Sequence, residues 1–247
     1  VEDKAEHAVN YYLWDNGKTL TVKFIGQGGS TKLREKIKVA AKEWEKYANL
    51  TFDFIESGEA NIRVLLTDQG GCNSVVGTNA LSKESDEKTM NIDTNFFHQN
   101  KICYDRYLNQ TIQHEFGHAI GLLHEHSYKG KIQWNKETVY KDAWDKAKWD
   151  KNMVDFQIFM QYESLYTNGF SYDPLSIMHY GYPAKWTANN VEIKSNFTIS
   201  EMDKATVKLL YPKTEARLNE FPRFIVTNFK PTKVVKNVER KGLLIYP

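Results

Sequence analysis

The sequence contains little cysteine, no long apolar run and no strong excess of charge. Two of its 247 residues are cysteines, and the formal net charge is +2. No apolar stretch approaches the roughly 20 residues that a membrane-spanning helix needs. These absences exclude a cysteine-built structural zinc site and a membrane span, and we expect neither nucleic acid nor a membrane as a partner. Two cysteines allow one disulfide or the two free thiols of a cytosolic protein.

The length and composition are those of a soluble globular protein with a sizeable core. Hydrophobic residues make up 41% of the chain and charged residues 26%, which is ordinary for this class. A chain of 247 residues can form one domain or two lobes around a cleft. We find no internal repeat and no low-complexity linker.

Alternating and helical apolar patterns predict the order of the secondary structure. Ser30 or Thr31 can cap the first long helix. Three tryptophans, Trp134, Trp144 and Trp149, could form a sugar or matrix platform, but we expect them to pack in the core. The predicted elements are strands over 19–25, 51–55, 61–66, 72–78 (exposed) and 90–93, and helices over 31–47, 105–121, 136–148 and 200–211.

Residues 114–125 carry the most informative pattern of the chain. His114 and His118 are four residues apart, so on a helix they lie on one face. Glu115 lies beside the first histidine, where its carboxylate can reach a water without binding the metal. Gly121 can take a positive φ, so the helix can end there and the chain can bring back His124. Three neutral imidazoles with an open fourth position predict one catalytic Zn²⁺.

Weaker interpretations of this motif are a satisfied core histidine and a chance His-Glu-x-x-His match. The extended pattern argues against both, because Gly121, His124 and Glu125 also fit. A metalloprotease with a glutamate as third ligand is disfavoured by His124. A structural zinc site would need a fourth protein ligand.

A second segment, residues 172–180, contains Ser-Ile-Met-His-Tyr and resembles the Met-turn of astacin-type metalloproteases. In that family the methionine forms a hydrophobic base beneath the zinc ligands, and the tyrosine two residues later reaches the metal or the developing oxyanion. By position these are Met178 and Tyr180. The plainer interpretation is that Met178 packs in the core and Tyr180 is a buried aromatic residue.

The resemblance to the astacin family covers most of the chain. Tyr12, Leu13, Trp14 and Gly17 resemble the start of a mature astacin domain, and Cys103 precedes the zinc helix as the family's partner cysteine does. Ala5 aligns with the usual first residue, which makes Val1 to Lys4 additional. The match fades after Tyr211. Within the family, the sequence resembles the bacterial secreted branch typified by myroilysin.

The resemblance implies an α+β fold with a metzincin-type, two-lobed catalytic domain. Its sheet should be twisted and mostly parallel with an antiparallel edge strand, next to two long helices, with the active-site cleft between the lobes. We expect the catalytic domain over 1–212, with an N-terminal lobe of about 1–124 and a C-terminal lobe of about 125–212. Residues 213–247 form an extension with apolar segments at 224–226 and 243–246. They could form a hairpin against the body or a contact surface, and the sequence does not decide between these.

The resemblance also implies roles for individual residues. Glu115 would be the general base and Tyr180 would stabilise the oxyanion, while Gly121, Glu125 and Met178 would shape the site. Cys72 and Cys103 would form a disulfide. The substrate would lie antiparallel to an edge strand formed by Asn73, Ser74, Val75, Val76 and Gly77.

The function implied is a secreted, extracellular zinc endopeptidase that acts on proteins or peptides as a monomer. The sequence shows no signal peptide, so we expect a processed form. The alternative is a catalytically inactive metzincin domain that binds proteins or matrix. Inactive relatives typically lose the base or a ligand, whereas Glu115 and all three histidines are present.

Overall fold

The computed structural model describes residues 8–9, 12–95, 104–161, 167–168, 172–213 and 244–245. Several sequence predictions fall elsewhere. Cys103, the segment 224–226 and the residues before Ala8 lie outside the described residues.

The described residues contain a six-stranded mixed sheet. Its strands are β2 (Thr19–Ile25), β3 (Thr51–Phe54), β4 (Ile62–Thr67), β5 (Asn73–Val75), β6 (Met90–Asp93) and β8 (Leu244–Ile245), in the order β3-β2-β4-β6-β5-β8. The first four strands in this order are parallel, whereas β5 runs antiparallel to both of its neighbours. The mixed α+β fold is therefore confirmed, as are the predicted strands over 19–25, 51–55, 61–66 and 90–93 within one residue.

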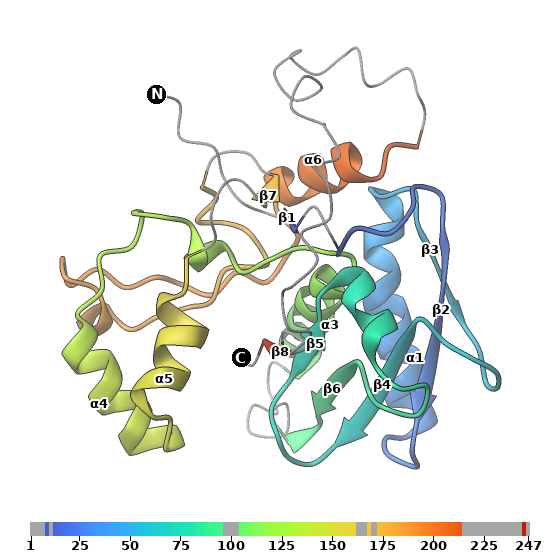
Figure 1. Cartoon of the computed structure of the whole chain (residues 1–247), viewed down its shortest axis with the longest axis horizontal. Coiled ribbons are helices and arrows are strands. Elements are labelled where there is room, and N and C mark those ends of the chain that lie inside the picture. Colours follow the sequence, from blue (N-terminus) through green and yellow to red (C-terminus); the bar gives the residue numbers. More distant parts are fainter. Residues whose placement is uncertain are drawn as a thin grey trace.

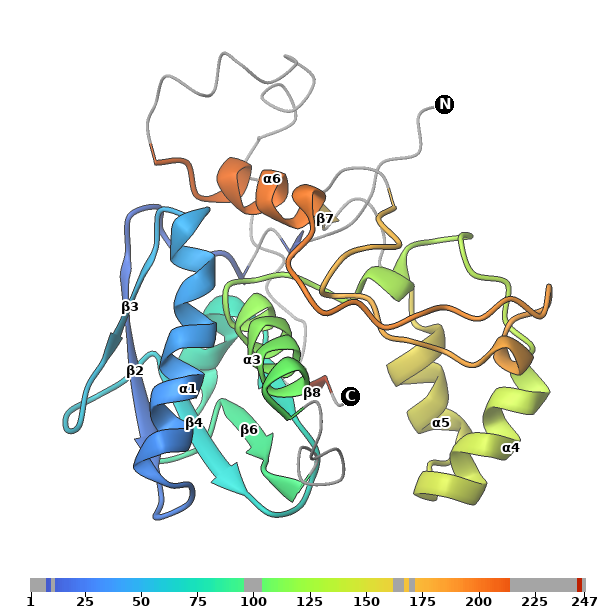
Figure 2. The ribbon, with the colours of Figure 1, turned by 180° about the vertical axis from the view of Figure 1, so that it is seen from behind.

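Two helices cover one face of this sheet, α1 (Thr31–Ala41) and α3 (Tyr104–Ala119), as Figures 1 and 2 show from opposite sides. Ser30 caps α1 by accepting a hydrogen bond from the Leu33 amide, and the chain continues as a 3-10 helix over Lys42–Lys46. Trp44 then donates to the carbonyl of Gln113 in α3 at 2.8 Å. The helices and the sheet enclose the main hydrophobic core, into which Phe116 of α3 points edge-on against Phe52 at 5.1 Å.

The prediction of an exposed strand over 72–78 is wrong in its exposure and its length. Strand β5 spans only Asn73–Val75, and all residues from Cys72 to Gly77 are buried. Val76 is still extended, but Gly77 has φ +48° and begins a 3-10 helix over Gly77–Ser82. Burial arises because β6 and β8 flank β5 while α3 packs on its face.

A second, smaller core lies under α4 (Lys136–Ala147), α5 (Lys151–Val154) and a π-helical turn over Asp155–Phe159. It contains Val139, Ala143, Val154, Ile158 and Tyr182. Trp134 and Trp149 pack against this cluster as expected, but Trp144 is 54% exposed, so the prediction of core packing is wrong for that residue.

The last long helix, α6 (Glu201–Leu210), begins with a capping box between Ser200 and Asp203. The short strands β1 (Ala8–Val9) and β7 (Thr167–Asn168) pair antiparallel, on the side of the molecule where α6 lies (Figure 1). Among the described helices, none has both the length and the apolar character required to cross a membrane.

Candidate metal centre and active site

The three histidines of the motif converge on one point. His114 and His118 lie on α3, and His124 follows the turn after it. Their Nε2 atoms are 3.1 Å, 3.1 Å and 3.2 Å apart, and each side chain is at most 5% exposed. Together they form a group of ligand atoms suited to a metal ion.

Hydrogen bonds on the far side of two rings show which nitrogens face the centre with lone pairs. The Nδ1 of His114 lies 2.8 Å from the carbonyl of Ile177, and that of His118 lies 2.8 Å from the carbonyl of Leu122. A carbonyl only accepts, so both Nδ1 atoms donate and both Nε2 atoms are unprotonated. Lone pairs that face each other at 3.1 Å repel unless a cation lies between them.

The spacing of these nitrogens fits zinc. Zn–N bonds of about 2.0–2.1 Å in tetrahedral geometry place two nitrogens roughly 3.3 Å apart, close to the observed 3.1–3.2 Å. Burial lowers the pKa of all three imidazoles, that of His114 to about 4, so they are neutral as metal ligands must be.

The chain reaches this arrangement because α3 ends abruptly. Gly121 has φ +102°, which L side chains rarely adopt, and a Cβ there would lie 2.8 Å from Leu13. Two aromatic residues fix the turn. Tyr211 donates to the carbonyl of Ile120 at 2.6 Å, and the Trp14 indole donates to that of Ala119 at 2.8 Å. The turn is therefore held by two residues that lie 197 positions apart in the sequence.

Glu115 lies next to the first ligand and is 1% exposed. Its Oε2 has no hydrogen-bond partner among the described residues. Burying a carboxylate oxygen without a hydrogen-bond partner costs free energy, so such an atom usually binds a water or a substrate. Burial raises the pKa of this carboxyl well above its ordinary value, which increases its tendency to take up a proton.

Met178 packs against α3 and leaves no room for a side chain at Gly117. A Cβ on Gly117 would lie 2.5 Å from the Sδ atom of Met178 and 3.3 Å from the Trp44 ring. The backbone of Met178 also accepts a hydrogen bond from the amide of Glu125 at 3.1 Å. The Met-turn is thus joined to the segment that follows the third histidine.

Tyr180 packs its ring on the ligands. It stacks on His114 with ring centroids 4.9 Å apart and lies 4.4 Å from the ring of His124. Burial, and next to it the charge of Glu115, raises the pKa of the Tyr180 phenol well above its ordinary value. The hydroxyl therefore keeps its proton and can donate a hydrogen bond.

Two acidic residues accept hydrogen bonds from the segment 173–177 beside the histidines. Only one of them was predicted from the sequence. Glu125 accepts a hydrogen bond from the amide of Asp173 at 2.6 Å. Asp203, which we did not predict, accepts from the hydroxyl of Ser176 at 2.6 Å and from the amide of Ile177 at 2.8 Å. The Ser-x-x-Asp pattern at 200–203 signals a helix cap, but no local signal indicates this second role.

A cavity of about 470 Å³ opens beside the histidines. His114, Glu115 and Cys72 contribute to its lining, which is mostly apolar. Other lining residues include Tyr107, Ala143, Trp149, Ile158, Tyr180, Tyr182 and Trp186. The cavity is large enough for a bulky apolar side chain next to the metal centre.

Comparison with known proteins shows the family to which the chain belongs. The model of the Astacin peptidase family matches residues 7–210. The chain belongs to the astacin family. A solved structure of myroilysin superposes with a TM-score of 0.78 at 37% identity, covering 84% of this chain and 99% of that one. This match agrees with the myroilysin-like branch predicted from the sequence.

More distant astacins align as well. Zinc metalloproteinase nas-13 of Caenorhabditis elegans is 27% identical over 94% of this chain and 46% of its own length, so the chain spans about half of that relative. A hatching enzyme zinc-protease of Oryzias latipes, with a TM-score of 0.53 at 19% identity, covers 81% of this chain and 94% of its own and shows the shared fold alone. The astacin family uses one catalytic zinc, which the three-histidine group can hold.

The predicted disulfide stays a prediction. Cys72 is buried, with its Sγ 3.4 Å from the amide nitrogen of Asp93, and it forms no disulfide within the described residues, which do not include its predicted partner Cys103. Burial, and to a lesser extent Glu115, raises the pKa of this thiol.

Proposed function

We propose that this astacin-family chain is a secreted zinc endopeptidase in which Glu115 is the general base. The observation that carries the proposal is the unpartnered Oε2 of Glu115, buried beside three imidazole lone pairs. An inactive binding domain has no need to keep a buried carboxylate in this costly state.

In this mechanism His114, His118 and His124 hold the zinc ion. When bound, the ion supplies a Lewis acid that lowers the pKa of a water toward about 7 and polarises the scissile carbonyl. Glu115 accepts the proton of the attacking water and passes it to the leaving amine. Tyr180 donates a hydrogen bond to the oxygen on which negative charge develops.

The substrate backbone would pair antiparallel with β5. Strand addition provides main-chain hydrogen bonds that tolerate many sequences. The 470 Å³ cavity beside Glu115 would receive a side chain near the scissile bond. Its apolar lining favours a large apolar side chain at that position.

The test is casein hydrolysis by the full chain, with and without a chelator, compared with Glu115→Gln. We expect activity in the wild type, loss on chelation, recovery on adding zinc, and loss in Glu115→Gln with zinc still bound. The exposed Glu59→Gln is a matched control that should keep full activity. A zinc-loaded wild type that cleaves nothing would favour the inactive binding domain instead.

A further inference from the structure

The C-terminal strand β8 occupies the outer edge of β5. It pairs antiparallel, with Ile245 opposite Ser74 and Leu244 opposite Val75. Figure 1 shows β8 beside β5, close to α3. In the sheet order β8 is the last strand, so it covers the side of β5 that would otherwise be the edge.

This edge is the one at which the proposed function places the substrate. Cys72, which directly precedes β5, lines the cavity together with His114 and Glu115. A strand paired with β5 therefore passes close to the metal centre. Because β8 is antiparallel, it runs from Val75 toward Ser74, and hence toward the Cys72 end of β5. Its carboxyl-terminal end points to the metal centre, as does the acyl half of a cleaved peptide.

We propose that the C-terminal residues 244–245 occupy the peptide-binding edge of β5 as a product-like strand and compete with substrate. The proposal rests on the proposed function for the identity of the edge. The 30 residues between Lys213 and Leu244 can span up to roughly 100 Å, so the same chain can supply the strand.

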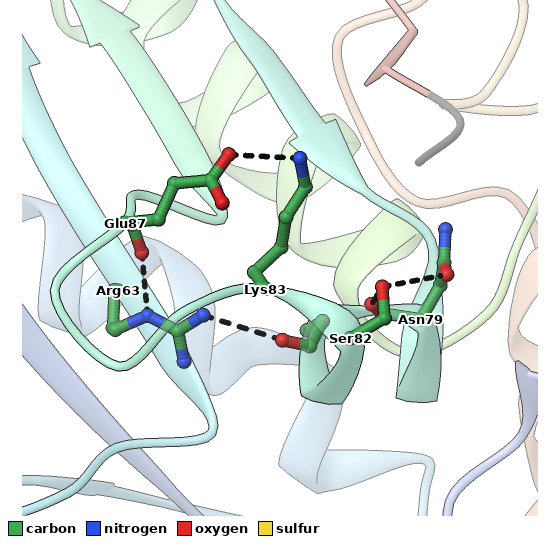
Figure 3. Close-up of polar contacts among 6 residues, drawn as sticks. Arg63, Asn79, Ser82, Lys83 and Glu87 are labelled. Atoms are coloured by element: carbon green, nitrogen blue, oxygen red, sulfur yellow. Dashed lines mark hydrogen bonds and ion pairs between the residues drawn. The ribbon is translucent and has the colours of Figure 1, made fainter. Parts of the chain in front are cut away.

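Contacts that do not involve β8 hold β5 in place. On its other side β5 pairs with β6, and the Val75 amide donates to the Thr89 carbonyl at 2.8 Å. The buried Arg63 holds the segment after β5 by donating to the carbonyls of Ala80 and Glu87, as Figure 3 shows. Removal of β8 should therefore leave β5 in place and open to another strand.

The competition between residues 244–245 and the substrate should raise KM only moderately. Attachment to the same chain keeps the strand at an effective concentration on the order of millimolar, while so short a strand makes few hydrogen bonds. We expect release of the strand to lower KM by about three- to tenfold. The kcat and the zinc content should not change, because the strand lies outside the ligand set.

The experiment compares the full chain with a form ending at Lys213, and with a Leu244→Pro, Ile245→Pro double variant that cannot donate to β5. Val235→Pro, the same change elsewhere in the extension, is the matched control. On a fluorogenic peptide the truncated and double-variant forms should show the lower KM, and the control should not. A synthetic peptide of residues 238–247 should inhibit the truncated form competitively.

Binding of that peptide is also measured without catalysis, by fluorescence anisotropy on the truncated Glu115→Gln protein. Binding of the peptide to this variant, together with a zinc-loaded wild type that hydrolyses nothing, would reject the proposed function but keep the strand assignment. An unchanged KM with no peptide binding at millimolar concentration would overturn the inference. So would a truncated form that loses zinc, because the strand would then be structural. A KM that falls on dilution of the full chain would assign the strand to a second copy and overturn the intramolecular arrangement.

Discussion

The carboxylate of Asp203, at the start of α6, accepts a hydrogen bond of 2.6 Å from the hydroxyl of Ser176 in the Met-turn. Its other oxygen accepts from the amide of Ile177 at 2.8 Å, and the Ile177 carbonyl in turn accepts from His114. The cap of the last long helix is thus two hydrogen bonds away from His114, a proposed zinc ligand. Both Asp203 and Ser176 are fully buried, so this link has few alternatives in solvent.

Asp203→Asn should lower both the stability and the zinc affinity. An amide offers one acceptor in place of two, so a buried donor loses its partner at a cost of about 1–3 kcal/mol. In a chain of this size each kcal/mol corresponds to a fall in Tm of roughly 2–4 °C. Thermal unfolding and zinc titration with a competing chelator measure the two effects.

The control for Asp203→Asn is Ser30→Ala, which removes the cap of α1 far from the Met-turn. It should cost about 0.5–2 kcal/mol of stability and leave zinc affinity unchanged. Equal zinc affinity in Asp203→Asn and the wild type would show that α6 does not influence the metal centre.

Gly117→Ala should destabilise the protein through a clash with Met178. The new Cβ would lie 2.5 Å from Sδ, a distance that real side chains do not tolerate. Overpacking of this kind typically costs about 1–3 kcal/mol. Chemical denaturation of Gly117→Ala, Met178→Leu and the double variant gives the coupling between the two positions. We expect the shorter leucine to restore part of the loss, and purely additive effects would refute the contact.

Asp142→Asn should reveal a stability contribution that depends on pH. Hydrogen bonds from Lys185 and then Trp186 lower the pKa of the Asp142 carboxyl. A lowered folded-state pKa stabilises the protein above the ordinary value of about 3.9. This stabilisation is lost as the pH falls through the lower, folded-state pKa. At pH 7 we expect the variant to be less stable by roughly 1 kcal/mol.

The measurement is the difference in Tm between wild type and Asp142→Asn from pH 7 to pH 3. The difference should be full near neutrality and shrink below about pH 4. Asp145→Asn, which removes only an exposed ion pair with Lys141, should change Tm little at any pH. A difference that grows as the pH falls would contradict the assigned sign.

Local patterns sufficed for most of the fold and for the ligand triad. The helices at 136–148 and 200–211 are confirmed within one or two residues because capping and apolar spacing are local properties. The three histidines could be grouped because i, i+4 spacing and a glycine at 121 determine their geometry. The segment 151–159 escaped prediction because its π-helical turn changes the helical period.

Long-range pairings could not be predicted. The partner of residues 244–245 is a strand about 170 positions earlier, and nothing near Leu244 identifies it. Asp203 illustrates the same limit, because its cap is visible in the sequence while its bonds to Ser176 and Ile177 depend on how α6 packs. Exposure of β5 was mispredicted for this reason, since its burial depends on β8 and α3.

Cys72 and Cys103 should be joined by a disulfide if the protein is secreted as proposed. Thiol titration of the denatured, unreduced chain should detect no free thiol, and two after reduction. In the chain-entropy model the bridge stabilises by about 3–4 kcal/mol, so reduction should lower Tm by several degrees. Two reactive thiols before reduction would remove the bridge and weaken the extracellular assignment.

Tyr180→Phe tests the role of the hydroxyl at the metal centre. The ring stacks on His114 and lies close to His124, and phenylalanine preserves these contacts, so zinc should stay bound. If the hydroxyl meets charge that exists only in the transition state, its removal lowers kcat and leaves KM nearly unchanged. Loss of one such donor typically lowers kcat by about 10²–10³-fold.

Tyr182→Phe is the matched control for this experiment. Tyr182 lines the same cavity, and its hydroxyl is buried without a hydrogen-bond partner in the described structure. Removing that hydroxyl leaves no donor or acceptor unsatisfied, so stability and kcat should both remain near wild type. Steady-state kinetics and zinc analysis of the two variants separate the possibilities. A normal kcat in Tyr180→Phe would reduce Tyr180 to a packing residue, whereas loss of zinc would make it chiefly a metal ligand.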